Sequence, residues 1–516
     1  MRFKRAGGIL LHPTSLFGDF GIGDIGPSAH QFIDLLGEVG CGLWQVLPLG
    51  PTGYGNSPYQ SFSSFAGNPY LISPKSLLED GLLTRDDLDD HPTFPAERVD
   101  YGKVIPWKQK LLRKAFDRYK KSYNKALIIE FEQFIHQQDS WLPEFSLYMA
   151  IKNNHDSVAW VDWPTPLRDR DTGSLEQARV SYEDEMNQEV FNQFIFHRQW
   201  ADLRARCANQ KIQIIGDIPI FVAHDSAEVW SNPELFFLDK SGNPTVVAGV
   251  PPDYFSETGQ LWGNPLYRWD IHRSYNYSWW IKRIESVLNF VDIVRIDHFR
   301  GFAGYWEIPY GSPTAEKGRW VPAPGEDFFK KVLGSLGELP VIAEDLGVIT
   351  PDVVALRQKF DLPGMIVLQF AYYGNPTEAF LPHNHVENRA VYTGTHDNDT
   401  TSGWFEKISE EEKHFWRRYM GRDGNDVAWD MIRAAWSSVS VFALAPLQDF
   451  LSLDSNARMN LPGDTSGHWE WRMKEKSLNE ELKQNLADFN FLYNRSTLFS
   501  KEEEPQGNPY SPGSTV

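Results

Sequence analysis

The sequence predicts an α/β fold, a (β/α)8 or TIM barrel with large, mostly helical insertions after its second and third strands and no C-terminal β-sandwich. Three observations predict it. Eight short apolar segments rich in β-forming residues each end in a polar or glycine-rich corner, as buried parallel strands do. Helical patterns lie between several of them, which is typical of β–α units with right-handed crossovers. Two further intervals are too long to be loops of a compact barrel.

The ends of the strands matter most for function, because TIM barrels place their chemistry at the carboxyl ends of the strands. The predicted strands are residues 8–16, 43–49, 212–222, 290–298, 340–346, 364–371, 390–396 and 439–447. Polar residues at the ends of these segments are therefore the candidates for a functional site.

Two barrel helices have clear boundary signals. Ser28 is the expected capping residue of a helix whose apolar residues share one face, and Gly40 is its expected stop. A second helix is expected to open at Thr350, with Pro351 in its first turn and Asp352 near the positive end of the helix dipole. These signals agree with helices packed outside a parallel barrel.

The two long intervals are expected to be insertions into a single catalytic barrel of residues 1–500. Residues 51–210 hold amphipathic stretches at 107–119, 128–136 and 190–205, so this insertion is expected to be mostly helical. Residues 223–280 are expected to be lid-like, because 241–264 are rich in glycine, proline and aromatic residues. A last long helix is expected at 469–493, and residues 501–516 are expected to form a flexible tail.

Composition narrows the class of protein. The 516 residues carry 50 Lys and Arg against 69 Asp and Glu, a net charge of −19, so nucleic acid and anionic membrane surfaces are not expected partners. No apolar stretch approaches the length of a membrane span or a signal-peptide core. Two cysteines, Cys41 and Cys207, cannot form a disulfide framework, which favours a reducing, cytoplasmic compartment. Aromatic residues make up 14% of the chain; most are expected in the core, but such rings also suit sugar faces.

Acidic side chains gather at the predicted strand ends. Strand alternation puts Arg295 and Asp297 on the same side, so the guanidinium should keep Asp297 ionised. An ionised carboxylate opposite a neutral carboxylic acid is the arrangement that glycoside cleavage needs, and Glu344 is the candidate proton donor. Asp217, inside the third apolar segment, is costly there unless it is paired.

Other interpretations of these residues remain open. Arg295 and Asp297 could form a structural ion pair at the barrel rim, and Asp217 could be a buried, satisfied acid. His396 and Asp397 could form a hydrogen-bonded corner or belong to a metal site, although few histidines lie at strand ends. The sequence has no P-loop, nucleophile elbow or dinucleotide-binding glycine motif, so we expect neither an organic cofactor nor a metal.

The pattern resembles the amylomaltase family of 4-α-glucanotransferases, the disproportionating enzymes within the α-amylase clan, over nearly the whole chain. Arg295-Ile296-Asp297 resembles the clan motif with the nucleophile, and Glu344-Asp345-Leu346 the motif with the acid/base. Further matches are Asp217 on the third strand and Thr395-His396-Asp397, which in the clan holds a third, transition-state-stabilising acid.

The sequence departs from the wider clan in ways that argue against an ordinary α-amylase. Val222 and Arg300-Gly301 stand where the clan usually has a histidine and a Lys-His pair. Residues 55–61, 249–255, 262–265 and 460–463 instead resemble amylomaltase signatures. The resemblance implies that four residues line the glucan subsites, two of them with flat rings for stacking: Tyr59, Trp262, Ser57 and Gln260.

This resemblance implies transfer of α-1,4-glucan segments from a glucan or maltooligosaccharide donor to the 4-hydroxyl of a glucan or glucose acceptor. Asp297 would attack the anomeric carbon while Glu344 protonates the leaving oxygen, in a retaining double displacement through a covalent glycosyl-enzyme. His396 and Asp397 would bind hydroxyls of the distorted sugar, and Asp217 another hydroxyl of the same glucose. An α-1,4-glucan hydrolase, a silent glucan-binding barrel and a barrel metallohydrolase remain alternatives.

Overall fold

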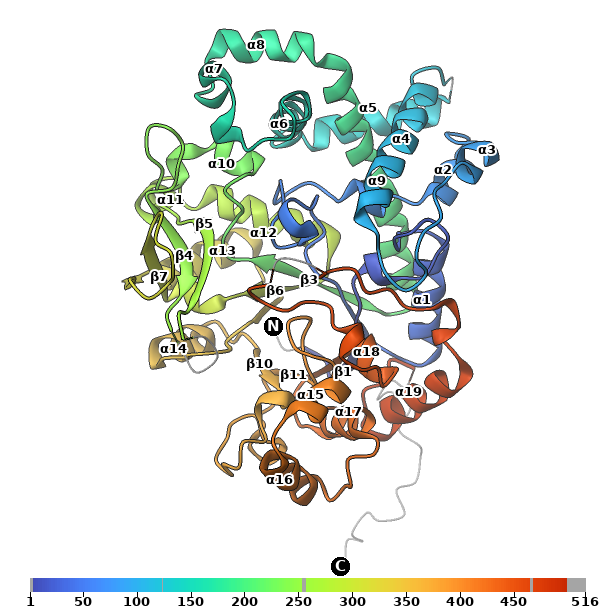
Figure 1. The fold of residues 1–516 in the computed structure, drawn as a ribbon, viewed down its shortest axis with the longest axis vertical. Helices are drawn as coiled ribbons and strands as arrows, with labels where there is room; N and C mark the ends of the chain where they lie inside the picture. Colours follow the sequence, from blue (N-terminus) through green and yellow to red (C-terminus); the bar gives the residue numbers. More distant parts are fainter. Residues whose placement is uncertain (1–2, 123, 253–256, 465–466, 499–516) are drawn as a thin grey trace, which may run out of the picture.

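Eight parallel strands close into a barrel at the centre of the molecule (Figure 1). The computed structural model describes residues 3–122, 124–252, 257–464 and 467–498, so the predicted tail at 501–516 lies outside it. The barrel strands are β1 (Ala6–Leu10), β2 (Leu43–Gln45), β3 (Gln213–Pro219), β6 (Ile293–Asp297), β9 (Val341–Ala343), β10 (Gly364–Val367), β11 (Arg389–Tyr392) and β12 (Phe442–Pro446). Every predicted strand overlaps one of them, and the predicted barrel is confirmed.

The observed strands are shorter than the predicted ones. Residues 8–16 were expected to form one strand, but β1 ends at Leu10 and a 3-10 helix follows at Pro13–Ser15. Pro13 has no N–H to donate to a neighbouring strand, so the ladder stops before it. Apolar residues continue past the strand ends because the loops above the barrel are also buried.

Side chains that point into the barrel form an apolar layer under the functional end. Ile215 and Ile293 are fully buried in this layer with side chains from the other strands. Two residues further along the same strands come Asp217 and Arg295, which pair with each other across the β3–β6 register. Strand alternation therefore puts a charged layer directly above the apolar one.

Most helices of the barrel itself lie on its outside (Figure 1). They are α1 (Pro27–Glu38), α12 (Ser278–Phe290), α13 (Gly325–Leu336), α14 (Pro351–Lys359), α15 (Thr401–Lys407), α16 (Glu410–Met420), α17 (Val427–Ser437), α18 (Leu447–Phe450) and α19 (Glu480–Leu492). The predicted cap of α1 is wrong: Gly26 is the N-cap, and Ser28 lies within the first turn, because Pro27 fits the first helical position. Its stop is right, since Gly40 has a φ of 69°.

Of the other two predicted helices, one is confirmed and one is only partly right. Helix α14 begins at Pro351 with Thr350 as its N-cap and Asp352 in its first turn, as expected. The long helix expected at 469–493 is wrong in its first half. Residues 470–472 instead pair with the segment before helix α4, a 3-10 helix follows at Glu475–Ser477, and Asn479 then caps α19.

Helices dominate the chain between β2 and β3. They are α2 (Pro74–Glu79), α3 (Arg85–Asp89), α4 (Tyr101–Tyr119), α5 (Lys125–Gln137), α6 (Leu142–Asn154), α7 (Thr165–Arg168), α8 (Thr172–Ser181) and α9 (Glu183–Asn209). The three predicted amphipathic stretches fall in α4, α5 and α9. Figure 1 shows this group above the barrel, with α9 running back towards β3.

A second sheet, which the sequence did not predict, lies beside the barrel. After β3 come α10 (Ala227–Ser231), β4 (Val246–Val250), β5 (Gln260–Pro265) and α11 (Trp269–Ser274), while β7 (Gly304–Pro309) and β8 (Arg319–Pro322) follow β6. The four strands pair antiparallel in the order β5, β4, β7, β8. Its strands come from two separate parts of the chain, so no local pattern indicated the sheet.

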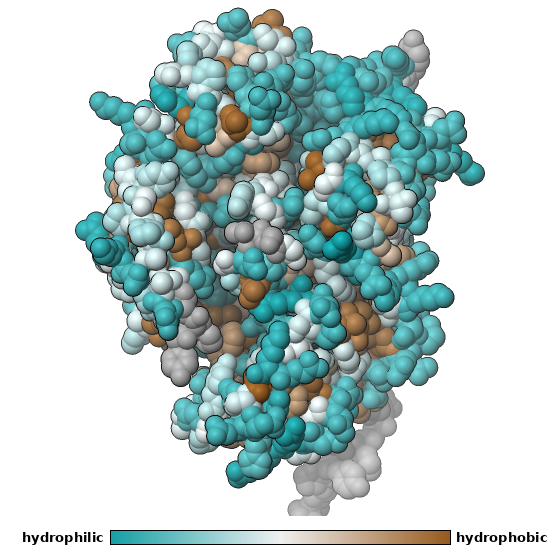
Figure 2. All heavy atoms as spheres, viewed as in Figure 1, coloured by the Kyte–Doolittle hydropathy of each residue, from teal (hydrophilic) through white to brown (hydrophobic). Residues whose placement is uncertain are grey.

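The surface is largely polar. Figure 2 shows hydrophilic side chains over most of one face, with small, scattered apolar patches. Among the described residues, no helix combines the length and the apolar character needed to cross a bilayer.

Candidate active site

The carboxyl ends of β3, β6 and β9 bring the predicted acids together. In the register, Asp217 pairs with Arg295, and Ile296 pairs with Ala343. Asp297 is the last residue of β6 and Glu344 directly follows β9, so the two acids leave neighbouring strands at the same level. Neighbouring strands lie about 4.8 Å apart.

Arg295 joins two carboxylates. One guanidinium nitrogen donates to Asp217 Oδ2, and the other donates to Asp297 Oδ1 at 2.7 Å. The side chain of Asp217 is fully buried, whereas that of Asp297 is 29% exposed. Burial alone would lower the pKa of Arg295, but the two carboxylates raise it well above its usual value. The pair thus presents an accessible, ion-paired carboxylate at Asp297.

Glu344 has a different environment. Its Oε2 accepts a hydrogen bond from the backbone N–H of His298 at 2.7 Å, and its Oε1 accepts one from Leu346 at 2.9 Å. Burial, together with the negative charge of Asp297, nevertheless raises the pKa of Glu344 to about 8. Glu344 is therefore mainly protonated at neutral pH, next to a carboxylate held by an arginine.

His298, whose backbone makes that contact, was not among the predicted site residues. It directly follows β6, which places its N–H beside Glu344, and its φ of 52°, in the left-handed region, turns the chain away from the strand. Burial lowers the pKa of its imidazole to about 4, so the ring is neutral at pH 7. The ring meets Trp262 edge to face at a centroid distance of 4.8 Å. A backbone torsion of this kind leaves no signal in the sequence.

His396 and Asp397 lie beyond the end of β11. Their side chains are 3.3 Å apart, and Asn460 donates to Asp397 Oδ1 at 2.6 Å. Arg458 donates to the backbone carbonyl of Asp397 at 2.6 Å. Burial opposes ionisation of Asp397, but His396 and Asn460 outweigh it and hold the pKa of this carboxyl well below its usual range. Asp397 is therefore ionised at neutral pH.

Tyr59 connects the two groups of acids. Its hydroxyl donates to Asp217 Oδ2 at 2.7 Å, and its ring stacks on His396 with centroids 5.1 Å apart and planes 14° apart. One face of the ring is thus covered by His396, so Tyr59 is less open to a sugar than the sequence suggested. Ser57 lies in the same loop and accepts a hydrogen bond from the Tyr59 N–H through its Oγ at 3.2 Å.

Gln260 and Trp262 approach from the second sheet. Both are on β5, and Trp262 Nε1 donates to Gln260 Oε1 at 3.1 Å. Both side chains are partly exposed. Because Trp262 also touches His298, β5 meets the barrel next to Asp297 and Glu344.

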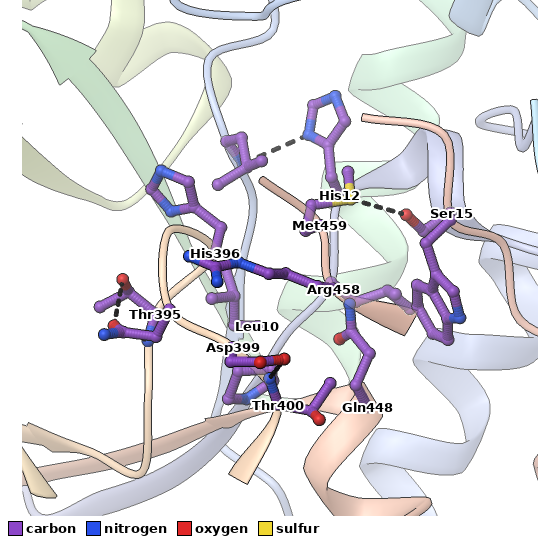
Figure 3. A pocket seen from close by; sticks show the side chains of 15 residues that line it. Leu10, His12, Ser15, Thr395, His396, Asp399, Thr400, Gln448, Arg458 and Met459 are labelled. Carbon is purple, nitrogen blue, oxygen red and sulfur yellow. Dashed lines mark hydrogen bonds between the residues drawn. The ribbon is translucent and has the colours of Figure 1, made fainter. Parts of the chain in front are cut away.

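A small pocket, with about 30 Å³ of space for water-sized molecules, is lined in part by His396. Figure 3 shows Arg458 extending across it, between His12 and Asp399. His12 Nδ1 accepts a hydrogen bond from the Leu47 N–H at 3.3 Å, and burial lowers the His12 pKa to about 3. His12 is therefore neutral at pH 7 and adds no positive charge beside His396.

Metal ligands do not cluster in the part of the chain that the structure covers. It contains no group of three or more His, Cys, Asp or Glu side chains placed to hold a metal ion. Cys41 and Cys207 are both buried free thiols.

Comparisons with known proteins agree on one family. A family model described as 4-alpha-glucanotransferase matches residues 11–479. The 4-alpha-glucanotransferase of Thermus thermophilus is 51% identical over 93% of this chain and 97% of its own length. That of Synechocystis is 48% identical over 95% of this chain and 98% of its own. The structure of an amylomaltase from Streptococcus agalactiae in complex with acarbose superposes with a TM-score of 0.93 and 39% identity, covering 96% of this chain and all of that one.

Proposed function

The chain belongs to the 4-alpha-glucanotransferase family and has the activity of that family, and from this premise we propose which of its residues perform the transfer. Asp297 is the nucleophile, Glu344 is the general acid and base, and Asp397 stabilises the transition state. The observation that carries the proposal is the contrast between two neighbouring carboxyl groups: Asp297 is accessible and paired with Arg295, while Glu344 has a pKa raised to about 8. Such a pair supplies a nucleophile and a proton donor at the same pH.

In the first step Asp297 attacks the anomeric carbon of the donor, and the bond from that carbon to the glycosidic oxygen breaks. Glu344 gives its proton to the departing oxygen, which leaves as the 4-hydroxyl of the released chain. The enzyme then holds a covalent glycosyl ester on Asp297, and Glu344 is a carboxylate. Retaining glycosidases hold the two carboxyl groups about 5 to 5.5 Å apart, and the spacing of neighbouring strands supports such a distance here.

In the second step Glu344 takes the proton from the 4-hydroxyl of an acceptor as that oxygen attacks the ester carbon. The glucan is transferred with retained configuration, and both carboxyl groups return to their starting states. Transfer rather than hydrolysis requires that an acceptor outcompetes water at this point. The hydrolase alternative is not favoured, because the named relatives are transferases.

The remaining polar residues serve the same glucose. Asp397 and His396 are proposed to bind hydroxyls that move closer as the sugar ring flattens in the transition state. Asn460 and Arg458 already fix the position of Asp397. Asp217 is proposed to act chiefly through Arg295, because its carboxylate is covered. The buried Oδ1 of Asp217 has no hydrogen-bond partner among the described residues, and a direct bond from Asp217 to a sugar hydroxyl, which the family resemblance implies, stays a prediction.

Substrates are proposed from the family. We propose α-1,4-glucans and maltooligosaccharides as donors and a glucan or glucose as the acceptor, with Gln260, Trp262, Ser57 and Tyr59 lining the subsites. The acarbose complex of the Streptococcus agalactiae amylomaltase supports an oligosaccharide groove in this fold. A cytoplasmic location remains a prediction from cysteine content.

Trapping the ester tests the proposal directly. A fluorinated, activated glucosyl donor slows the second step, so the label should stay on Asp297 and be found there by peptide mass spectrometry. In parallel, pure maltotriose should be converted to longer and shorter chains at a nearly constant number of reducing ends. A label on another carboxylate contradicts the assignment of the nucleophile, and a steady rise in reducing ends contradicts dominant transfer.

A further inference from the structure

Trp469 lies directly behind the proposed sugar-binding side chains and is itself 6% exposed. Its ring centroid is 5.8 Å from that of Tyr59 and 5.9 Å from that of His396. Tyr59 and His396 stack on each other at 5.1 Å. The three rings therefore form a closed triangle, in which Trp469 packs against both Tyr59 and His396.

The backbone of Trp469 is in an unfavourable conformation. Its φ is 64°, a left-handed value that bulky side chains rarely adopt. Such residues persist where surrounding contacts hold them, and they gather at functional sites. The observed strain is thus a reason to ask what keeps Trp469 in place and what its ring does there.

The helical insertion keeps it in place. The Tyr101 hydroxyl, at the start of α4, donates to the Trp469 carbonyl at 2.9 Å. The Val99 N–H donates to the Glu470 carbonyl at 2.7 Å, and the Trp469 N–H donates to the Met459 carbonyl at 2.9 Å. Three hydrogen bonds from two other segments thus fix the chain on both sides of the strained residue.

The ring touches residues at the ends of both charged networks. It packs against Tyr59, whose hydroxyl donates to Asp217. Asp217 and Asp297 are both bound by Arg295. It also packs against His396, whose side chain lies next to that of Asp397. A shift of this one ring would therefore disturb the nucleophile and the stabilising acid together.

We propose that Trp469 is a positioning residue for transfer, clamped by Tyr101 of the helical insertion so that its ring fixes the orientations of Tyr59 and His396. The inference rests on the roles proposed above for those two residues. It gives the helical insertion a part in catalysis, because a contact from α4 holds Trp469, near the other end of the chain, against Tyr59 and His396.

The matched control is Tyr277, which shares the unusual features of Trp469 but lies in a different setting. Tyr277 has a φ of 56° and is 1% exposed, and its ring packs against Trp269 and Phe328. Its hydroxyl donates to Asp327 rather than to any proposed site residue. Trp469→Gly and Tyr277→Gly each remove a buried aromatic ring and relieve a left-handed backbone. Their losses in melting temperature give the structural cost alone.

Steady-state transfer kinetics with maltotriose then separate the two roles. Trp469→Gly should lower kcat by about tenfold to a hundredfold, as small misplacements of reacting groups do, with KM changed by less than about threefold. Tyr277→Gly should leave kcat within about twofold of wild type. A Trp469→Gly enzyme with wild-type kcat and a stability loss like that of Tyr277→Gly would overturn the proposal.

Three milder variants keep the test decisive if Trp469→Gly does not fold. Tyr101→Phe keeps its ring but loses the hydroxyl that holds the Trp469 carbonyl, and it should lower kcat severalfold. Trp469→Phe and Tyr59→Phe should be non-additive in kcat, because the Trp469 ring is proposed to act on Asp217 through the Tyr59 hydroxyl, which Tyr59→Phe removes. Additive effects, or a Tyr101→Phe enzyme with unchanged kcat, would count against the clamp. Labelling of Asp297 in the wild-type enzyme is independent of these results, so failure of the catalytic assignment and failure of this inference remain distinct.

Discussion

The backbone N–H of His298 donates to Oε2 of Glu344 at 2.7 Å, across the gap between β6 and β9. Because His298 directly follows Asp297, this one bond fixes the proposed nucleophile and the proposed proton donor relative to each other. The bond favours the ionised form of Glu344, while burial and the charge of Asp297 favour the protonated form and prevail. The site thus holds a neutral acid in a place prepared for its carboxylate, which suits a residue that alternates between the two forms.

Replacing the nucleophile should stop covalent chemistry. Asp297→Asn is expected to lower kcat at least about a thousandfold, since removal of a nucleophile leaves only binding and transition-state contacts, and to abolish labelling by the fluorinated donor. The control is Asp292→Asn, at the other end of the same strand segment, where Asp292 is paired with Arg204 at 2.8 Å. Transfer by Asp297→Asn at a near-normal rate would remove Asp297 from this role.

Replacing the acid should depend on the leaving group. Glu344→Gln is expected to lower transfer from maltooligosaccharides by about a hundredfold to ten-thousandfold, the usual contribution of a general acid. With a glycosyl fluoride, whose leaving group needs little protonation, the first step should continue and the intermediate should accumulate. Rapid-quench mass spectrometry measures it, and failure of the fluoride to form any intermediate would show that Glu344 is not the acid.

The raised pKa of Glu344 gives a pH dependence with a definite sign. The first step needs its protonated form, so its rate should fall as the pH rises through about 8. Neutralising Asp297 removes a charge that raises this pKa, so substrate-independent titration of Glu344, for example by difference infrared spectroscopy, should shift to lower pH in Asp297→Asn. An unchanged titration would show that Asp297 does not act on Glu344.

The same pKa predicts a stability effect. An unfolded glutamic acid has a pKa near 4.5, so between that value and about 8 the folded state binds the proton more tightly than the unfolded state does. Ionising Glu344 therefore costs stability above pH 4.5, and the full cost is present above about pH 8. Glu344→Gln should melt roughly 2 °C higher than wild type at pH 8.5, with the difference vanishing at pH 4. A difference that is equal at both pH values would contradict the assignment.

Asn460 should matter through Asp397. Asn460→Ala removes the donor at 2.6 Å from Asp397 Oδ1, so the pKa of this acid should rise from its depressed value and kcat should fall by about tenfold. Asn456→Ala is the control. Asn456 lies four residues before Asn460 in the same segment, but it donates to the exposed Asp454. Equal effects of the two variants on the acid limb of the kcat profile would rule out a specific role.

Residue patterns along the chain were enough to predict the barrel and to identify its acids. Buried parallel strands must be short apolar runs, and a charge is tolerated only where such a run ends or is paired, so Asp217, Asp297 and Glu344 could be found by reading strand ends. Alternation along β6 was enough to place Arg295 beside Asp297. The same local logic overextended the strands and misplaced the cap of α1, because buried loops are also apolar and Pro27 could start a helix one residue before Ser28.

How these acids are held depends on contacts between distant segments, which became visible in the folded chain. The second sheet, the ring triangle of Tyr59, His396 and Trp469, and the bond from His298 to Glu344 join segments that are far apart in the chain or depend on a left-handed backbone torsion. None of these three features produces a periodic pattern in the sequence. Burial also settled that Asp217 is covered while Asp297 is open, since the exposure of a carboxylate depends on every segment packed over it rather than on its neighbours in the chain.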